Sequence, residues 1–229
     1  MFVFLIALKS RNASQDWQLT TKLLSQTLES IQNQTNSNYK IVVVCNEKLA
    51  IPSNVDWVLT DNASPDLNAD FHLKEKDRAK RLLIGYEYAK KYNPDYLMPV
   101  DADDFVSQHI TEYALNDNNK SNGWYLDSGY IYEHNNQLIH IDNGFKDYCG
   151  SSLIINTCKF LDYFDGDIYL HNQSNNLIPL PFDGVIYNRC NGDNFAATKP
   201  LKESMGRADP KFMYESINEN ILRAFNFKV

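Results

Sequence analysis

Three carboxylates follow an apolar run near the middle of the chain. In the stretch YLMPVDADD, the apolar residues 96–100 precede Asp101, Asp103 and Asp104. Carboxylates two residues apart at a strand end are close enough to share one hard cation, and without it they would repel one another. Mg²⁺ and Mn²⁺ prefer oxygen ligands and commonly bridge protein carboxylates to a diphosphate. The spacing therefore predicts a divalent metal site.

The same aspartates have a structural alternative. Aspartate is favoured at helix N-termini, where its side chain accepts hydrogen bonds from free backbone N–H groups, and a helix is expected over 107–116. The DADD residues would then cap that helix. Their position after an apolar strand, itself preceded by a helix rich in Lys and Arg, favours the metal site, but this pattern leaves both interpretations open.

The first hundred residues alternate between two hydrophobic periods. Continuous apolar runs predict buried strands, and apolar residues at helical spacing predict amphipathic helices. Strands alternating with helices indicate an α/β fold with a mainly parallel sheet, in which ligands lie outside the carboxyl ends of the strands. The expected strands are 2–8, 40–46, 55–60 and 95–100, and the expected helices begin at Asp16 and span 74–92.

The second half of the chain is predicted to be richer in antiparallel strands. A long segment rich in Asp, Asn, Gly and Pro, residues 162–207, is expected to form loops around a site or a mobile lid. The remaining expected elements are β-rich runs at 123–133 and 137–141 joined by a hairpin at 134–136, a strand at 149–156, and a last helix with Asp209 as N-cap, Pro210 at its first position and an apolar face from Phe212 to Phe225.

Composition limits the classes of function. The 229 residues, 43% of them hydrophobic, can bury a full core within one domain, and the net charge of −7 argues against nucleic acid as the main partner. The four cysteines form no C-x-x-C pair, which favours reduced thiols in a cytoplasmic protein. The opening MFVFLIAL is interpreted as a buried strand, and no run reaches the roughly 18 to 20 apolar residues that span a bilayer.

The order FLIAL, KIVVVCNE and KDRAKRLLIGYEYAKKYNPDYLMPVDADD resembles nucleotide-sugar-dependent glycosyltransferases of the GT-A fold, of the family-2 type. The resemblance covers residues 1–190 and is firmest at 74–105. It implies a nucleotide-sugar-binding half at 1–105, and an acceptor half with a C-terminal helix at 106–229. It further implies metal-dependent, inverting transfer from a nucleoside-diphosphate sugar to a glycan, lipid or polysaccharide-precursor acceptor, with Mn²⁺ or Mg²⁺. Peripheral association with a membrane stays open.

The resemblance also assigns roles to the acidic motif. The first aspartate of such motifs approaches the ribose or a metal-bound water, and the last one ligates the metal together with the diphosphate. By this resemblance Asp101 takes the first role and Asp103 the second. Asp104 is a supporting carboxylate or a second metal ligand.

Other nucleotide contacts depart from the family pattern. Relatives carry an Arg-Asn pair where this chain has Leu82 and Leu83, so Arg78 and Arg81 are expected to contact the nucleotide or diphosphate instead. Their alternative is a solvated basic face. Two further candidates are Arg11, in the KSRN stretch after the first strand, and Asp61, after the third strand, which a turn beside Asn62 explains equally well.

Inverting transfer needs a general base beside the acceptor hydroxyl. By resemblance the base is Asp183 of PFDGVIYNRC, with Asp165 and Asp167 as alternatives; a turn beside Gly184 would also explain Asp183. Additional candidates are His171 as a third metal ligand and Lys199, Lys202 and Arg207 as residues that close over the diphosphate.

Two other functions remain open. A catalytically degenerate GT-A domain that binds nucleotide or glycan without turnover is compatible with the departures at 46–47 and 82–83. A sugar-phosphate nucleotidyltransferase also uses an α/β fold and a metal, but KSRNASQD lacks the glycine expected after the first strand of that class.

Overall fold

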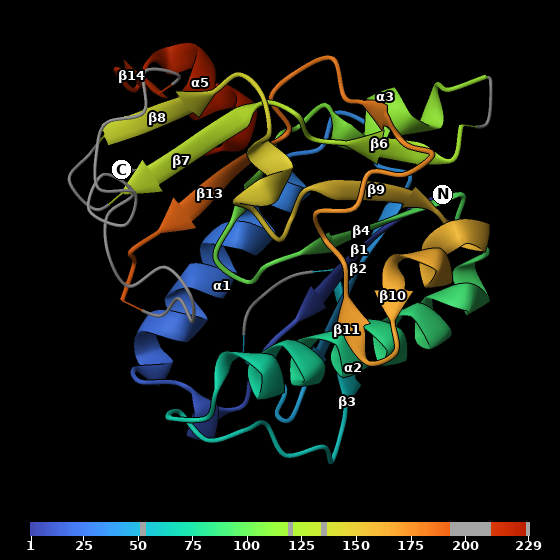
Figure 1. The fold of residues 1–229 in the computed structure, drawn as a ribbon, viewed down its shortest axis with the longest axis vertical. Helices are drawn as coiled ribbons and strands as arrows, with labels where there is room; N and C mark the ends of the chain where they lie inside the picture. The colour runs from blue at the N-terminus through green and yellow to red at the C-terminus, as the bar shows by residue number, and fades with distance from the viewer. Residues whose placement is uncertain (51–53, 119–120, 134–136, 193–211, 228–229) are drawn as a thin grey trace.

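A seven-stranded sheet forms the centre of the molecule (Figure 1). The computed structural model describes residues 1–50, 54–118, 121–133, 137–192 and 212–227. Four adjacent strands of the sheet, β3, β2, β1 and β4, are parallel, and β9 is antiparallel to its two neighbours β4 and β6. The order across the sheet is β12 (Ile178–Pro179), β6 (Gly123–Tyr125), β9 (Leu153–Asn156), β4 (Tyr96–Val100), β1 (Phe2–Ala7), β2 (Tyr39–Cys45) and β3 (Val55–Leu59).

Both faces of this sheet are covered because its central strands are apolar on both sides. Along β1, Phe2, Phe4 and Ile6 face one core, which includes α1 (Trp17–Gln32). Val3 and Leu5 face the other, which includes α2 (Phe71–Ala89). This arrangement explains why β1 is a continuous apolar run rather than an alternating one.

A second, five-stranded sheet is mostly antiparallel. Ile131, Ile139 and Val185 from it join the same core as α1. It packs beside α5 (Glu219–Phe225), whose N-cap Asn218 accepts hydrogen bonds from two backbone amides. Its order is β14 (Phe212–Glu215), β8 (Gln137–Ile141), β7 (Gly129–Glu133), β13 (Val185–Arg189) and β5 (Phe105–Val106).

Aspartate caps begin the two long helices. Asp16 accepts hydrogen bonds from the N–H groups of Gln18 and Leu19 before α1, and Asp70 accepts one from Leu73 before α2. After α2 the chain turns at Asn93, whose φ of 47° is left-handed, and Pro94 prevents further helix. The other elements within the described residues are α3 (Ile110–Leu115), η1 (Arg11–Ala13), η2 (Lys90–Tyr92), η3 (Phe145–Asp147), η4 (Thr157–Tyr163), β10 (Phe164–Asp165) and β11 (Ile168–Tyr169).

Several predicted elements differ from the structure. The run 123–133 is two strands in different sheets, because the chain leaves the large sheet between β6 and β7. The segment after residue 162 holds β10 to β13 rather than only loops. The last helix begins at Glu219, and the chain before it pairs with β8 as strand β14. The predicted hairpin turn 134–136 and cap residues Asp209 and Pro210 lie outside the described residues.

The mainly parallel sheet with helices on both faces was predicted correctly, as were the four early strands to within about two residues. Among the described helices, none combines the length and apolarity needed to cross a membrane.

Candidate functional site

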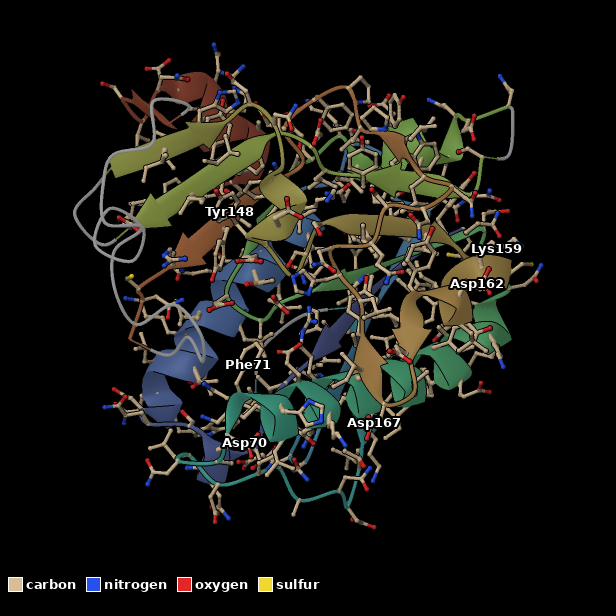
Figure 2. The ribbon with its side chains drawn as sticks, in the orientation of Figure 1. Asp70, Phe71, Tyr148, Lys159, Asp162 and Asp167 are labelled. Atoms are coloured by element: carbon tan, nitrogen blue, oxygen red, sulfur yellow. The ribbon has the colours of Figure 1, made fainter. Side chains whose placement is uncertain are left out.

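A cavity of ≈ 190 Å³ opens at the carboxyl ends of β1 and β4, where the first half of α2 extends beyond the sheet. Figure 2 shows Tyr148 and Phe71 on two sides of this region, and both residues line the cavity. The charged residues that line it are four cationic and four anionic side chains: Lys9, Lys74, Arg78, Arg81, Glu75, Asp77, Asp101 and Asp103. The cavity is therefore where the predicted metal motif and the predicted arginines meet.

Asp101 is held by an arginine and a serine. The Nε and Nη2 atoms of Arg78 lie 2.9 and 2.7 Å from Asp101 Oδ1, and Nη2 also donates to the Gly150 carbonyl at 3.2 Å. The Asp101 backbone N–H donates to Ser151 Oγ at 2.8 Å. Burial lowers the pKa of Arg78, but the negative charges of Asp101 and Glu75 outweigh burial and raise it above its ordinary value. Arg78 is thus a fixed cation.

Asp104 is fully buried and does not line the cavity. Its Oδ2 accepts hydrogen bonds from Ser151 Oγ at 2.6 Å and Cys149 Sγ at 3.4 Å, and its Oδ1 accepts one from the Asn188 N–H at 3.1 Å. Burial raises the pKa of Asp104 well above its usual range, and the charges of Asp103 and Asp101 raise it further. Both oxygens accept from protein groups, which favours the predicted role of a supporting carboxylate over that of a second metal ligand.

Asp103 lines the cavity and is partly exposed. Its Oδ2 accepts a hydrogen bond from Asn191 Nδ2 at 2.7 Å, and Asn191 is itself fixed by a second bond to the Asn188 carbonyl. β13 and the chain just after it therefore orient two of the three aspartates, Asp104 through Asn188 and Asp103 through Asn191.

The helix-cap interpretation of DADD is wrong. Strand β5 follows the motif directly, and α3 begins only at Ile110 with His109 as its N-cap residue. No side chain caps that helix. The three aspartates are consequently free of any role at the start of α3.

Arg81 lies on the buried side of α2, with 1% of its surface exposed. Its Nε donates to Asp77 Oδ2 at 2.9 Å, and Nη2 donates to Asn46 Oδ1 at 2.9 Å and Ser64 Oγ at 2.7 Å. Its Nη1 has no hydrogen-bond partner within the described ranges. Burying an unpaired guanidinium donor is costly, so an acceptor atom on a bound ligand would supply the hydrogen bond that Nη1 lacks.

Two titratable groups in the cavity are shifted by their surroundings. Burial raises the pKa of Glu75; the Arg78 guanidinium, whose Nη1 lies 3.8 Å from Glu75 Oε2, opposes this effect. Burial and the charge of Arg78 lower the pKa of His171 to about 4, so the imidazole is neutral near pH 7. His171 does line the cavity.

The two remaining candidates for nucleotide binding lie elsewhere. Arg11 is exposed and pairs with Glu47, its Nε 3.0 Å from Oε1. Asp61 is exposed after β3. Neither lines the cavity, so the structure does not bring them together with Asp101.

The structure also places Asp183 away from the cavity. Its Oδ1 lies 3.1 Å from His140 Nε2, before the start of β13. Asp104 instead contacts Asn188, near the other end of β13, so most of the strand lies between the two contacts. The alternatives also lie outside: Asp165 is exposed on β10, and Asp167 pairs with Lys76 at 2.8 Å.

Several residues that line the cavity or hold its aspartates were not predicted from the sequence. Glu75 and Asp77 could have been found, because they stand three and four residues before Arg78 and Arg81 on one helix. Gly150 and Asn191 carry no local signal, since they reach the aspartates through tertiary contacts. The predicted closing residues Lys199, Lys202 and Arg207 lie outside the described part of the chain.

No protein-family model and no curated protein matches the sequence. Among solved structures, the chain is similar to S. aureus TarS 1-349, with a TM-score of 0.54 and 10% identity over 82% of this chain and 60% of that chain. TarS 1-349 in complex with UDP gives a TM-score of 0.51 with the same identity and coverage. A putative nucleotide-diphospho-sugar transferase from Desulfovibrio desulfuricans G20 gives 0.41, at 13% identity over 82% and 80% of the two chains.

At this level of identity the likeness establishes the fold. The chain has the GT-A type of α/β fold, with a mainly parallel sheet flanked by helices, which confirms the fold class predicted from the sequence. It spans about 60% of the TarS fragment that it matches.

Proposed function

We propose that the chain is a nucleotide-sugar-dependent glycosyltransferase whose sugar donor binds in the cavity beside β1 and β4. The observation that carries the proposal is the convergence of Asp101 and Asp103 with Arg78 and Arg81 at the carboxyl edge of a parallel sheet. Ligands of open α/β sheets bind at that edge. The similarity in fold to a protein solved with UDP supports the same class of ligand.

A divalent cation fits this site if protein carboxylates and substrate phosphates bind it together. Within the described residues, no cluster of three or more His, Cys, Asp and Glu side chains could hold a metal by itself. Mg²⁺, however, is commonly held by one or two carboxylates together with substrate phosphates. Asp103 and Asp101 would supply those carboxylates. The cation would neutralise charge on the departing diphosphate.

The protein itself would bind and orient the nucleoside diphosphate. Arg78 is fixed by Asp101 and the Gly150 carbonyl, and Arg81 keeps Nη1 without a partner among the described residues. Guanidinium groups suit phosphate oxygens because their donors lie in a rigid plane. Positioned cations of this kind stabilise a leaving group without having to reorganise during the reaction.

We place the general base inside the cavity rather than at Asp183. Glu75 lines the cavity, its side chain is 17% exposed, and burial raises its pKa toward the working range of a base. It would take the proton of an acceptor hydroxyl during inverting transfer to a glycan or a lipid-linked acceptor.

A thermal-shift panel tests the proposal. UDP, GDP, dTDP and CMP are each added with and without Mn²⁺ to the wild-type protein, to Asp103→Asn and to Asp66→Asn, an exposed carboxylate outside the cavity. At least one nucleotide should raise the wild-type Tm in the presence of Mn²⁺, and Asp103→Asn alone should lose the response. A wild-type protein that responds to none of the four would refute nucleotide-sugar binding, and an unchanged response of Asp103→Asn would remove the metal assignment.

Hydrolysis separates an enzyme from a domain that only binds. A glycosyltransferase should slowly hydrolyse the nucleotide sugar whose nucleotide gave the largest shift. Binding without any release of nucleoside diphosphate would indicate a catalytically degenerate domain.

A further inference from the structure

A second cavity lies at the opposite edge of the large sheet from β3. It has a volume of ≈ 620 Å³ and is formed by α3, the turn after it, β6 and the chain around β12. We call it the α3 groove; Tyr113, Asn116, Asp117, Trp124, Ile178 and Phe182 line it. It shares no lining residue with the cavity that holds Asp101. In Figure 1, α3 and β6 lie far from the first turn of α2.

Aromatic rings form one part of the groove. Tyr113 is 37% exposed and stands edge-on to Trp124 and Phe182, with ring centroids 5.6 and 5.4 Å away. Ile178 is 51% exposed in the adjacent edge strand. Large apolar side chains that stay exposed within a hollow, beside polar side chains, mark ligand sites more often than scattered surface residues do.

Polar groups without partners accompany these rings. Asn116 is exposed, and its side-chain amide makes no hydrogen bond within the described ranges. The Trp124 side chain is 1% exposed, and its Nε1–H has no acceptor in the same part of the chain. Because a buried indole N–H usually finds an acceptor, a ligand oxygen that enters the groove is one way to supply it.

Charge narrows the class of ligand. Among the described lining residues there is no lysine or arginine, whereas Glu112 and Asp117 are present, so a phosphate or carboxylate ligand would lie close to like charge. The carboxylates are also engaged with the protein. Asp117 Oδ2 accepts hydrogen bonds from Ser121 N–H and Oγ, and Glu112 Oε2 accepts one from Thr35 Oγ1. A cationic ligand would therefore have to compete with protein donors for these oxygens.

We propose that the α3 groove binds a neutral carbohydrate. The apolar C–H face of a sugar ring would pack on Tyr113 and Phe182, and its hydroxyls would hydrogen-bond the Asn116 amide, which offers both donor and acceptor atoms. This combination of aromatic surface with a few polar groups is what a small neutral polyol requires. The inference does not rest on the proposed transferase activity, because the two cavities are separate.

The test is a calorimetric titration of the whole chain with neutral tetrasaccharides of glucose, N-acetylglucosamine, mannose and xylose. At least one should bind with a Kd of roughly 1 mM or tighter. Tyr113→Ala should weaken that binding about tenfold, Tyr113→Phe should preserve it, and Asn116→Ala should weaken it several-fold. Leu161→Ala, which removes a 51% exposed side chain outside the groove, is the matched control and should bind as the wild type does.

Three outcomes would overturn the inference: no tetrasaccharide binds at about 10 mM, Tyr113→Ala binds as tightly as the wild type, or tetralysine or glucose 6-phosphate binds more tightly than every neutral sugar. Each variant is first checked for an unchanged Tm. The same samples are then titrated with the nucleotide panel, whose response depends on the other cavity. If no sugar binds in the groove, the nucleotide response of the other cavity should still be observed. If no nucleotide binds in that cavity, sugar binding to the α3 groove should still be observed.

Discussion

Arg78 of α2 and Asp101 at the end of β4 form a forked contact, in which two guanidinium nitrogens lie 2.9 and 2.7 Å from one carboxylate oxygen. The pair is largely shielded from solvent, with the two side chains 13% and 32% exposed. It joins the helix to the strand end beside Gly150, whose carbonyl accepts from the same arginine. This geometry makes the orientation of Asp101 dependent on three separate segments of the chain.

Gly150→Ala should break this contact without removing either charge. A Cβ at residue 150 would overlap Asp101 Oδ2 and come within 2.6 Å of Arg78 Nη2. We expect the free energy of unfolding to fall by about 1–3 kcal/mol, as for other overpacked sites. Nucleotide affinity should fall about tenfold or more because Asp101 is displaced. Urea unfolding and nucleotide titration measure the two effects.

Gly166→Ala is the matched control for this change. A Cβ there meets no atom within 4 Å, although its φ of 58° carries some strain. It should leave nucleotide affinity unchanged. Equal effects of both glycine variants on the nucleotide would contradict the role given to Gly150.

Asp104→Ala and Asp103→Ala should have opposite signatures. Removal of the buried Asp104 carboxylate leaves Ser151 Oγ and the Asn188 N–H without their acceptor, so stability should fall by about 2–4 kcal/mol. Removal of the partly exposed Asp103 should cost less than about 1 kcal/mol but abolish the Mn²⁺-dependent response to nucleotide. Chemical unfolding and thermal shift with Mn²⁺ distinguish the two. A stable Asp104→Ala protein that had lost only its metal response would restore Asp104 as a ligand.

Glu75→Gln should stop sugar transfer while Asp183→Asn should not. Glu75 lines the cavity, whereas Asp183 pairs with His140 elsewhere. Loss of a general base lowers the rate about 10²–10⁴-fold, and the isosteric amide should leave nucleotide affinity within a few-fold of the wild type. Turnover and nucleotide titration are measured on both variants. If Asp183→Asn proved inactive while Glu75→Gln stayed active, the base would have to be placed beside His140 again.

His171 should make the protein less stable as the pH falls toward 4. Burial and Arg78 hold its folded-state pKa at about 4, below the 6.5 expected in the unfolded chain. Between these values the unfolded state binds more protons, so the stabilising contribution is present above about pH 6.5 and is lost as the pH falls through the folded pKa. The loss is at most roughly 3 kcal/mol.

Urea unfolding in EDTA from pH 7 to pH 4 checks this, because His171→Gln should show a shallower dependence on pH than the wild type. His72→Gln, at an exposed position of α2, serves as the control. If the free energy of unfolding of His171→Gln depended on pH as that of the wild type does, another group would be responsible for the loss of stability at acidic pH.

The sequence by itself determined which residues lie at the carboxyl edge of the large sheet. Apolar runs predicted β1, β2, β3 and β4, and the position of DADD directly after the fourth run placed Asp101 and Asp103 at the cavity. Helical periodicity likewise predicted that α2 covers the sheet, with Arg78 and Arg81 on neighbouring turns. These positions follow from the hydrophobic periodicity of each segment and from the direction of the strands, and both can be read from the sequence.

Only the tertiary structure decided what each of these side chains does. Asp104 follows Asp103 in sequence but is buried, because β13 and Ser151 supply donors that no local pattern reveals. Asp183 lies two residues before the start of that same strand, and the pairing of β13 with β7 and β5 puts it at the end away from Asn191. Strand register and non-local hydrogen bonds set these positions, and both depend on segments that are far apart along the chain.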